Sequence, residues 1–305
     1  MRIVFMGTPE IAADVLCDVS QVHDVIGVFC QPDKPVGRKQ IITPPPVKVV
    51  AQERGLPVFQ PKGFRNGKAT GILRELSPDM ILVIAYGKIL PQEVLDIPPY
   101  GCINIHASLL PRYRGSAPVQ RSLMDGVKET GLTVMKMDAG IDTGAVYAQK
   151  TVQVTAEDNT QTMFEKMGKL AGPFVLDIMD RIHKGEIAPV PQDDSLATYA
   201  PPIEKSEGFF DFSRDAEEIV HLVQGLSGWP IAFFEFEGKK IKVESARFSE
   251  TTGEPGSILS GKPLTVAAGN GSVILKRLIP EGGKSMDGTA WLNGRRLQVG
   301  DSICR

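Results

Sequence analysis

Two polar side chains that could carry out chemistry lie two residues apart in the sequence GCINIHASLLP, at Asn104 and His106. The apolar run around them predicts a strand, and because side chains alternate between the faces of a strand, both project from the same face. A carboxylate, Asp142, follows in the glycine-rich turn DAGIDTG. An amide can donate to a developing oxyanion, an imidazole can donate or carry a proton, and a carboxylate can favour the imidazole's charged form. These three residues therefore predict acyl-transfer chemistry.

Alternating strand and helix patterns fill the part of the chain that must position these residues. The patterns predict strands at 2–6, 25–29, 80–85, 102–106 and 132–137, and helices at 9–19, 47–54, 117–125 and 159–183. Such alternation, with strands apolar along their whole length, predicts an α/β fold with a doubly wound, mostly parallel sheet. Ligands bind such sheets beyond the carboxyl ends of the strands. We therefore expect Tyr86, His106 and Asp142, which all follow strand ends, to share one crevice.

The remainder of the chain has a different pattern. Residues 189–207 are rich in proline and polar residues and predict a linker. Beyond them the sequence predicts one helix, at 215–226, and then short strands separated by Gly and Pro, at 231–237, 240–248, 264–268 and 272–278. Short strands with regular turns indicate a small β-barrel or sandwich, for which a barrel of oligonucleotide-binding type is one candidate. The predicted division is a catalytic domain at 1–188, the linker at 189–207 and a second domain at 208–305.

Composition narrows the class of protein. Hydrophobic residues make up 42% and charged residues 23% of 305 residues, which is typical of soluble globular chains. The four cysteines form no C-x-x-C pair and the four histidines show no metal-ligand spacing, so we expect no metal site and a reducing cytoplasm. No apolar stretch approaches the roughly 18 residues of a membrane-spanning helix, so we expect no membrane partner. Gly7 stands alone after the first strand without completing G-x-G-x-x-G, which argues against a dinucleotide enzyme.

The charge of the chain gives no general attraction to nucleic acid. The net charge is −2, and residues 206–305 contain 12 basic and 13 acidic residues. Any contact with an RNA phosphate backbone must therefore come from a local basic cluster.

Several longer tracts, taken together, resemble a known family. The tract INIHASLLPRYRGSAP, the downstream DAGIDTG and the early MGTPE are similar to the formyltransferase superfamily that uses 10-formyltetrahydrofolate. Within it, the loop QPDKPVGRKQIITPPPVKVVA, the strand end AYGKILP and the tail VQGLSGWPIAFFEFEGKKIKV look like the branch whose acceptor is methionyl initiator tRNA. The resemblance implies that the chain is a one-carbon transferase of translation initiation, with 10-formyltetrahydrofolate as formyl donor, no metal, and a tRNA-binding barrel at 208–305. We expect it to act as a monomer.

The resemblance also implies roles for particular residues. Asn104, His106 and Asp142 match the catalytic positions. The positions that match the folate pocket are Lys88, Leu90, Ser108, Leu109, Leu110, Pro111 and Asp138. Arg38 and Lys39 match a loop that contacts tRNA, and Gln224 departs from the basic residue that the pattern implies there.

Three other functions fit the same catalytic motif. The formyl acceptor could be an amino-sugar nucleotide, which predicts no dependence on RNA or on Arg38. Water could be the acceptor, as in a folate-hydrolysing module of a larger enzyme. A non-catalytic protein that binds folate or RNA would tolerate the loss of Asn104, His106 and Asp142 together.

Overall fold

The computed structural model describes residues 1–37 and 39–304, and the chain divides into two compact units. The first unit contains residues 1–116, 130–152 and 164–200, and the second contains residues 117–129, 153–163 and 201–305. Two short segments that lie between stretches of the first unit, 117–129 and 153–163, thus belong to the second unit. The expected boundaries at 188 and 207 stay a prediction.

The first unit holds most of the strands and helices near the predicted catalytic residues. Its strands are β1 (Arg2–Gly7), β2 (Asp24–Phe29), β3 (Lys34–Val36), β4 (Ile41–Thr43), β5 (Val58–Phe59), β6 (Met80–Ile84), β7 (Cys102–His106), β8 (Arg114–Gly115), β9 (Glu129–Lys136), β10 (Val146–Gln153) and β11 (Tyr199–Ala200). Its helices are α1 (Glu10–Val22), α2 (Pro46–Glu53), α3 (Lys68–Leu76), α4 (Gln92–Leu95), the greater part of α6 (Thr160–His183) and a short 3-10 helix, η1 (Asp194–Leu196).

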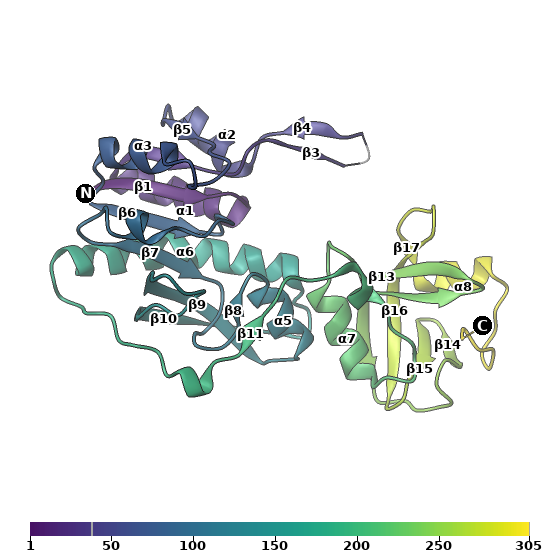
Figure 1. The fold of residues 1–305 in the computed structure, drawn as a ribbon. Coiled ribbons are helices and arrows are strands. Elements are labelled where there is room, and N and C mark those ends of the chain that lie inside the picture. Colours follow the sequence, from purple (N-terminus) through teal and green to yellow (C-terminus); the bar gives the residue numbers. More distant parts are fainter. Residues whose placement is uncertain (38, 305) are drawn as a thin grey trace. The chain divides into compact units, whose positions relative to one another are not determined.

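The central sheet of this unit has seven strands in the order β10-β9-β7-β6-β1-β2-β5 (Figure 1). β1 pairs in parallel with β2 and β6, and β6 with β7, whereas β9 runs antiparallel to β7. The expectation of a mostly parallel sheet is therefore confirmed.

The central strands β1, β6 and β7 are buried on both faces, as their apolar sequences predict. In β1, Val4 and Met6 join an apolar cluster with residues of α3 and α4, whereas the alternate residues Ile3 and Phe5 point to the other face and are equally buried. The edge strand β10 has exposed residues along its length, whereas the central strands are accessible only at their ends. Polar residues at those ends are therefore the ones that can meet a ligand.

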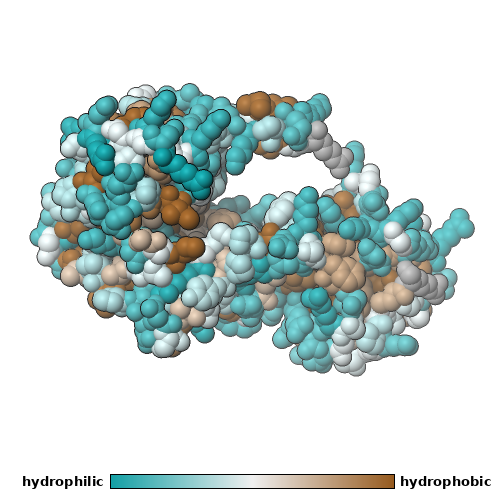
Figure 2. All heavy atoms as spheres, viewed as in Figure 1, coloured by the Kyte–Doolittle hydropathy of each residue, from teal (hydrophilic) through white to brown (hydrophobic). Residues whose placement is uncertain are grey.

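A β-hairpin of strands β3 and β4 extends from the first unit (Figure 1). It exposes the apolar side chains of Val36, Ile41 and Ile42, which form a brown patch on the projecting hairpin in Figure 2. Lys39, one of the two residues expected to contact RNA, is exposed in the turn between the strands. The other, Arg38, lies outside the described residues.

The second unit is built around an antiparallel sheet, β12-β13-β16-β15-β14, with β17 added beside β16. Its strands are β12 (Phe233–Phe236), β13 (Lys239–Ser249), β14 (Ile258–Gly261), β15 (Leu264–Ala267), β16 (Ser272–Pro280) and β17 (Met286–Asp287). Its helices are α5 (Pro118–Met124), η2 (Lys205–Gly208), α7 (Ala216–Gly225) and α8 (Gly288–Gly294). Phe234 and Trp291 pack edge to face in its apolar core. Short strands were expected here, and the type of barrel stays a prediction.

None of the helices in the described part of the chain is both long and apolar enough to cross a bilayer.

Candidate active site

Strand β7 carries Asn104 and His106 on one face of the sheet. In the antiparallel pair with β9, Asn104 lies opposite Met135 and His106 opposite Thr133. The Asn104 side chain is 8% exposed and the His106 side chain 6% exposed. The alternation expected from the sequence thus places both side chains on the same face at the carboxyl end of a central strand.

The His106 ring lies between two hydrogen-bond acceptors. Its Nε2 is 2.9 Å from the backbone oxygen of Tyr113, and its Nδ1 is 3.5 Å from Oδ2 of Asp142. Because a carbonyl oxygen only accepts, Nε2 must carry a proton and donate it to Tyr113. The Asp142 carboxylate faces the other ring nitrogen, Nδ1. The 3.5 Å separation leaves room for the Nδ1 proton to be shared with a third group.

Asp142 is held in an unusual conformation. Its φ is 55°, in the left-handed region, which costs an L-residue about 1–2 kcal/mol. Its Oδ2 accepts a hydrogen bond of 2.8 Å from the backbone N–H of Gly115. Earlier in the same turn, Asp138 Oδ1 accepts from the Gly140 N–H at 3.0 Å and from the Thr143 hydroxyl at 2.7 Å. The turn therefore directs the Asp142 carboxylate towards His106.

Gly115 can make this contact because it lacks a side chain. Its φ is +126°, and a Cβ placed there would lie 2.6 Å from the backbone oxygen of Ala200. Ala200 belongs to β11, which pairs in parallel with β8. A larger residue at 115 would push these strands apart and move the N–H that holds Asp142.

The Asn104 amide has no hydrogen-bond partner among residues 1–37 and 39–304, although it is nearly buried. Its polar atoms are not among the fully buried ones that lack a partner, so the amide reaches the surface, where an incoming group can bind it. A donor held beside an imidazole is what stabilisation of an oxyanion requires.

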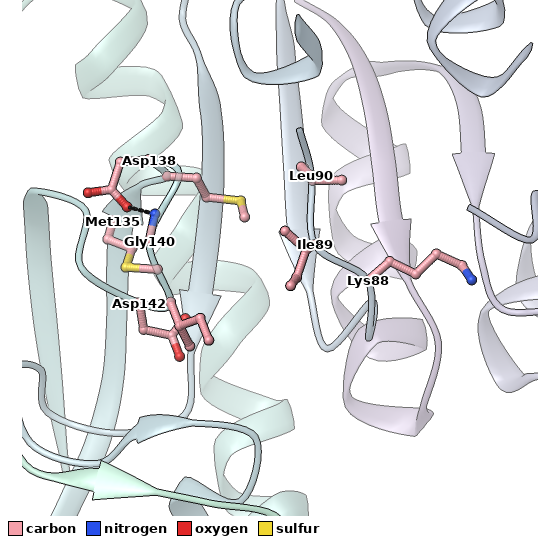
Figure 3. A pocket seen from close by; sticks show the side chains of 9 residues that line it. Lys88, Ile89, Leu90, Met135, Asp138, Gly140 and Asp142 are labelled. Carbon is pink, nitrogen blue, oxygen red and sulfur yellow. Dashed lines mark hydrogen bonds between the residues drawn. The ribbon is translucent and has the colours of Figure 1, made fainter. Parts of the chain in front are cut away.

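A cavity of about 150 Å³ is lined by Asp142, but not by Asn104 or His106. Lys88, Ile89 and Leu90 line one side of it, and residues that follow β9 in the chain line the other, together with two methionines (Figure 3). The full set of lining residues is Lys88, Ile89, Leu90, Met135, Met137, Asp138, Gly140, Ile141 and Asp142. Of the residues predicted to bind folate, Lys88, Leu90 and Asp138 line this cavity together with Asp142.

The Lys88 side chain points away from the cavity in Figure 3, and its Nζ donates to the backbone oxygen of Lys62 at 2.8 Å. In this arrangement the backbone of Lys88, and not its ammonium group, faces the cavity.

The loop of Ser108, Leu109, Leu110 and Pro111 is fixed by its own hydrogen bonds. Ser108 is fully buried, its hydroxyl donates to the Arg112 oxygen at 2.6 Å, and its backbone oxygen accepts from Thr133 Oγ1 at 2.6 Å. Leu110 N–H donates to the same Thr133 oxygen at 3.1 Å. These four residues do not line the cavity, so their expected role in folate binding stays a prediction.

Tyr86 does not share the crevice, and this expectation was wrong. Its side chain is 2% exposed, lies in the apolar cluster beneath the sheet edge, and has a hydroxyl without a partner in the described structure. Burial raises the pKa of Tyr86 well above its usual range. Tyr86, two residues past the end of β6, still packs in the apolar layer, which a strand-end rule alone does not reveal.

The structure adds residues that sequence reasoning missed. Tyr113 contributes a backbone oxygen, Gly115 a backbone N–H and Thr133 a buried hydroxyl. Gln192 donates from Nε2 to the backbone oxygens of Asp142 and Gly144, at 2.9 and 2.7 Å. The backbone contacts could not be predicted, because every residue type has the same carbonyl and nearly every one the same N–H. Gln192 was missed because it lies within the segment expected to be a linker.

Gln224, in the second unit, occupies the position where a basic residue was implied. Its Nε2 donates to the backbone oxygen of Ala156 at 3.0 Å. The amide therefore joins α7 to the segment before α6, a contact for which a neutral donor is sufficient.

Among the residues that the structure describes, no group of three or more His, Cys, Asp or Glu side chains is placed to hold a metal ion.

A doubly wound sheet with a polar site and a cavity at its strand ends is typical of α/β enzymes. Comparison with known families identifies the family of the chain. Residues 1–177 match the formyl transferase model and residues 202–296 match the formyl transferase C-terminal domain model. The chain belongs to the formyl transferase family.

The most similar curated relatives span nearly all of the chain. It is 44% identical to the methionyl-tRNA formyltransferase of Citrifermentans bemidjiense over 98% of this chain and 95% of that protein. It is 44% identical to the enzyme of the same name from Pseudomonas fluorescens over 97% of this chain and 94% of the relative.

Solved structures share the fold at lower identity. An N-formyltransferase of Helicobacter canadensis, in complex with folinic acid and dTDP-3-aminofucose, has a TM-score of 0.69 at 16% identity, over 90% of this chain and 98% of that one. Methionyl-tRNA formyltransferase from Clostridium thermocellum has a TM-score of 0.57 at 19% identity, over 83% of this chain and 95% of that one.

Proposed function

We propose that this chain transfers the formyl group of 10-formyltetrahydrofolate to the α-amine of methionine esterified to initiator tRNA. The observation that carries the proposal is the free amide of Asn104 beside a His106 ring that faces Asp142. Relatives that match the chain from end to end, and that are named for this reaction, support the choice of acceptor.

In this scheme the neutral amine attacks the formyl carbon, and a tetrahedral intermediate with a negatively charged oxygen forms. Free α-amines titrate near pH 8, so a share of the acceptor is competent at neutral pH. The Asn104 amide and the Nδ1 proton of His106 donate to the oxyanion, since Nε2 is already committed to Tyr113. Asp142 accepts the proton from the amine, directly or through water. As the bond from the formyl carbon to N10 breaks, the same proton passes to N10.

The cavity beside Asp142 suits the donor's flat ring system. Leu90, Met135 and Met137 give it apolar walls, and Asp138 and the backbone of residues 88–90 supply polar groups at its rim. Ser108, Leu109, Leu110 and Pro111 act in this proposal as a rigid support beneath the formyl group. Sites of this kind, mostly apolar with a few polar groups, are usual for small ligands.

The acceptor must reach the site from solvent. We assign contacts with the tRNA acceptor end to the loop of Arg38 and Lys39 and to the unit that carries the antiparallel sheet. The four cysteines are all free thiols, in keeping with a reducing cytoplasm, where the protein acts as a monomer in this proposal.

The test is formyl transfer from 10-formyltetrahydrofolate to methionyl initiator tRNA, with uncharged tRNA and free methionine as controls. Transfer to the charged initiator alone supports the proposal. In the same assay Asn104→Ala should lower kcat by about 10²–10³-fold with unchanged thermal stability, because one oxyanion donor is lost.

Other results would identify another acceptor. Transfer to a dTDP-linked amino sugar without transfer to tRNA would indicate a sugar-nucleotide enzyme, and formate release without any amine would indicate hydrolysis. Binding of folate without turnover in all three assays would indicate a non-catalytic protein.

A further inference from the structure

One segment of the chain, residues 190–200, contacts both neighbours of the His106 ring. Thr198 Oγ1 accepts from the Tyr113 N–H at 2.9 Å, next to the Tyr113 oxygen that accepts from His106. Gln192 Nε2 donates to two backbone oxygens within the turn, those of Asp142 and Gly144. The segment is thus fastened to the two groups that hold the imidazole.

The Gln192 amide has one fixed orientation. Its Oε1 accepts from Arg114 Nε at 3.1 Å and from an Arg114 terminal nitrogen at 2.8 Å. A guanidinium only donates, so the amide oxygen must face it and the NH₂ group must face the two carbonyls. Arg114 is 3% exposed and also pairs with the exposed carboxylate of Asp194 at 2.7 Å, so turning away would leave its own buried guanidinium without these partners.

These contacts matter because Asp142 has little else to hold its backbone. Its side-chain Oδ2 accepts a hydrogen bond from the backbone N–H of Gly115, and Gly115 follows Arg114 in the chain. Its backbone oxygen accepts a hydrogen bond from the Gln192 amide. Gln192 therefore fixes the turn through the backbone of Asp142, and Gly115, the residue after Arg114, fixes it through the Asp142 side chain.

The geometry points to Gln192, oriented by Arg114, as a positioning residue that sets the distance between the Asp142 carboxylate and His106 Nδ1. This inference rests on the proposed function for its kinetic consequence. Reacting groups displaced by about 1 Å can lose about 10²-fold in rate, so the amide bridge should affect turnover although it does not touch the substrates.

Gln192→Glu separates positioning from folding. The glutamate keeps an acceptor for Arg114, so the buried guanidinium stays paired. It loses both donors to the Asp142 turn and places a carboxylate against two carbonyl oxygens. We expect kcat to fall by about 10²-fold, with KM for 10-formyltetrahydrofolate and thermal stability unchanged. Gln21→Glu is the charge-matched control, because that exposed amide only bonds Cys17 in its own helix, at 3.0 Å.

A second readout follows the imidazole itself, without substrate. The chain has four histidines, so their ring ¹⁵N resonances can be resolved and assigned. Gln192→Glu should shift the His106 ring nitrogens and leave those of His183, which contacts Tyr100, in place. This readout stays valid if the acceptor proves to be another amine. Wild-type kcat in Gln192→Glu, or a lowered kcat with unmoved His106 resonances, would overturn the inference.

Discussion

At the scale of the residue, the Asp142 carboxylate combines two roles that one substitution can separate. It faces Nδ1 of His106 with a negative charge and accepts a hydrogen bond from Gly115. Asp142→Asn keeps an oxygen for Gly115, and asparagine tolerates the left-handed conformation at φ 55°. We expect kcat to fall by about 10²–10⁴-fold, the usual share of acid–base catalysis, with an unchanged melting temperature.

Asp142→Ala is the comparison for this variant, because it also loses the bond to Gly115 and should lower the melting temperature. Turnover close to that of the wild type in Asp142→Asn would remove the charge of this residue from the mechanism.

At this scale the sequence predicted the residues whose side-chain type and spacing indicate a chemical role. Asn104 and His106 were found from strand alternation, and their shared face is confirmed. The Tyr113 oxygen could not be found, because every residue has the same backbone carbonyl. Only the fold of the loop, with Tyr113 at φ 62°, aims that carbonyl at the imidazole.

At the scale of the element, Thr133 of β9 joins the sheet to the loop that follows β7. Its hydroxyl donates to Ser108 and accepts from Leu110, and both contacts are buried. Thr133→Val conserves shape but leaves a buried N–H and a buried carbonyl without this partner, which costs about 1–3 kcal/mol. The urea midpoint should therefore fall. Thr151→Val in the neighbouring strand β10 is the control, because Thr151 is exposed, and an equal loss there would contradict the argument.

Helix α7 contains a histidine that should make stability depend on pH. Burial, with a smaller contribution from Lys128, lowers the pKa of His221 below 6.5, and Glu217 and Glu218 oppose this only partly. A Cβ on Gly126 would lie 2.3 Å from the ring, so the ring is closely packed.

The neutral form of His221 is thus favoured in the folded chain. Its contribution to stability is complete above the unfolded pKa of 6.5 and is lost as the pH falls below it towards the folded pKa. His221→Gln should flatten the decline in unfolding free energy on that acidic side of 6.5, measured by denaturant titration at a series of pH values. His183→Gln, at an exposed histidine, is the control. An undiminished decline in His221→Gln would assign the pH dependence to other groups.

Elements with strong periodicity were predicted well and short ones were not. The strand at 102–106 agrees in both bounds, and the helix expected at 159–183 begins one residue later. The hairpin of β3 and β4 was missed because its strands have three residues each and are exposed, so no buried face imposes a pattern. Helix α3 was missed as well, since glycine at 67 and 71 weakens a helical prediction.

At the scale of the whole molecule, a net charge of −2 means that attraction to RNA must be local. β13 offers such a site: Ile241 and Val243 are buried, so the alternate residues Lys240 and Lys242 share the outer face. Lys240 also lies over the ring of Phe233, at 4.5 Å. We expect this face to bind phosphates of the tRNA.

The double variant Lys240→Gln with Lys242→Gln should therefore raise KM for methionyl-tRNA and leave KM for 10-formyltetrahydrofolate unchanged. Each lost phosphate contact lowers the slope of log KM against log salt by about one, so the slope should fall by about two. The control, Lys62→Gln with Lys68→Gln, removes the same charge from two exposed positions of the first unit. An equal change in both double variants would mean that net charge alone governs the encounter. A smaller slope in the β13 variant alone would place tRNA phosphates on this sheet face.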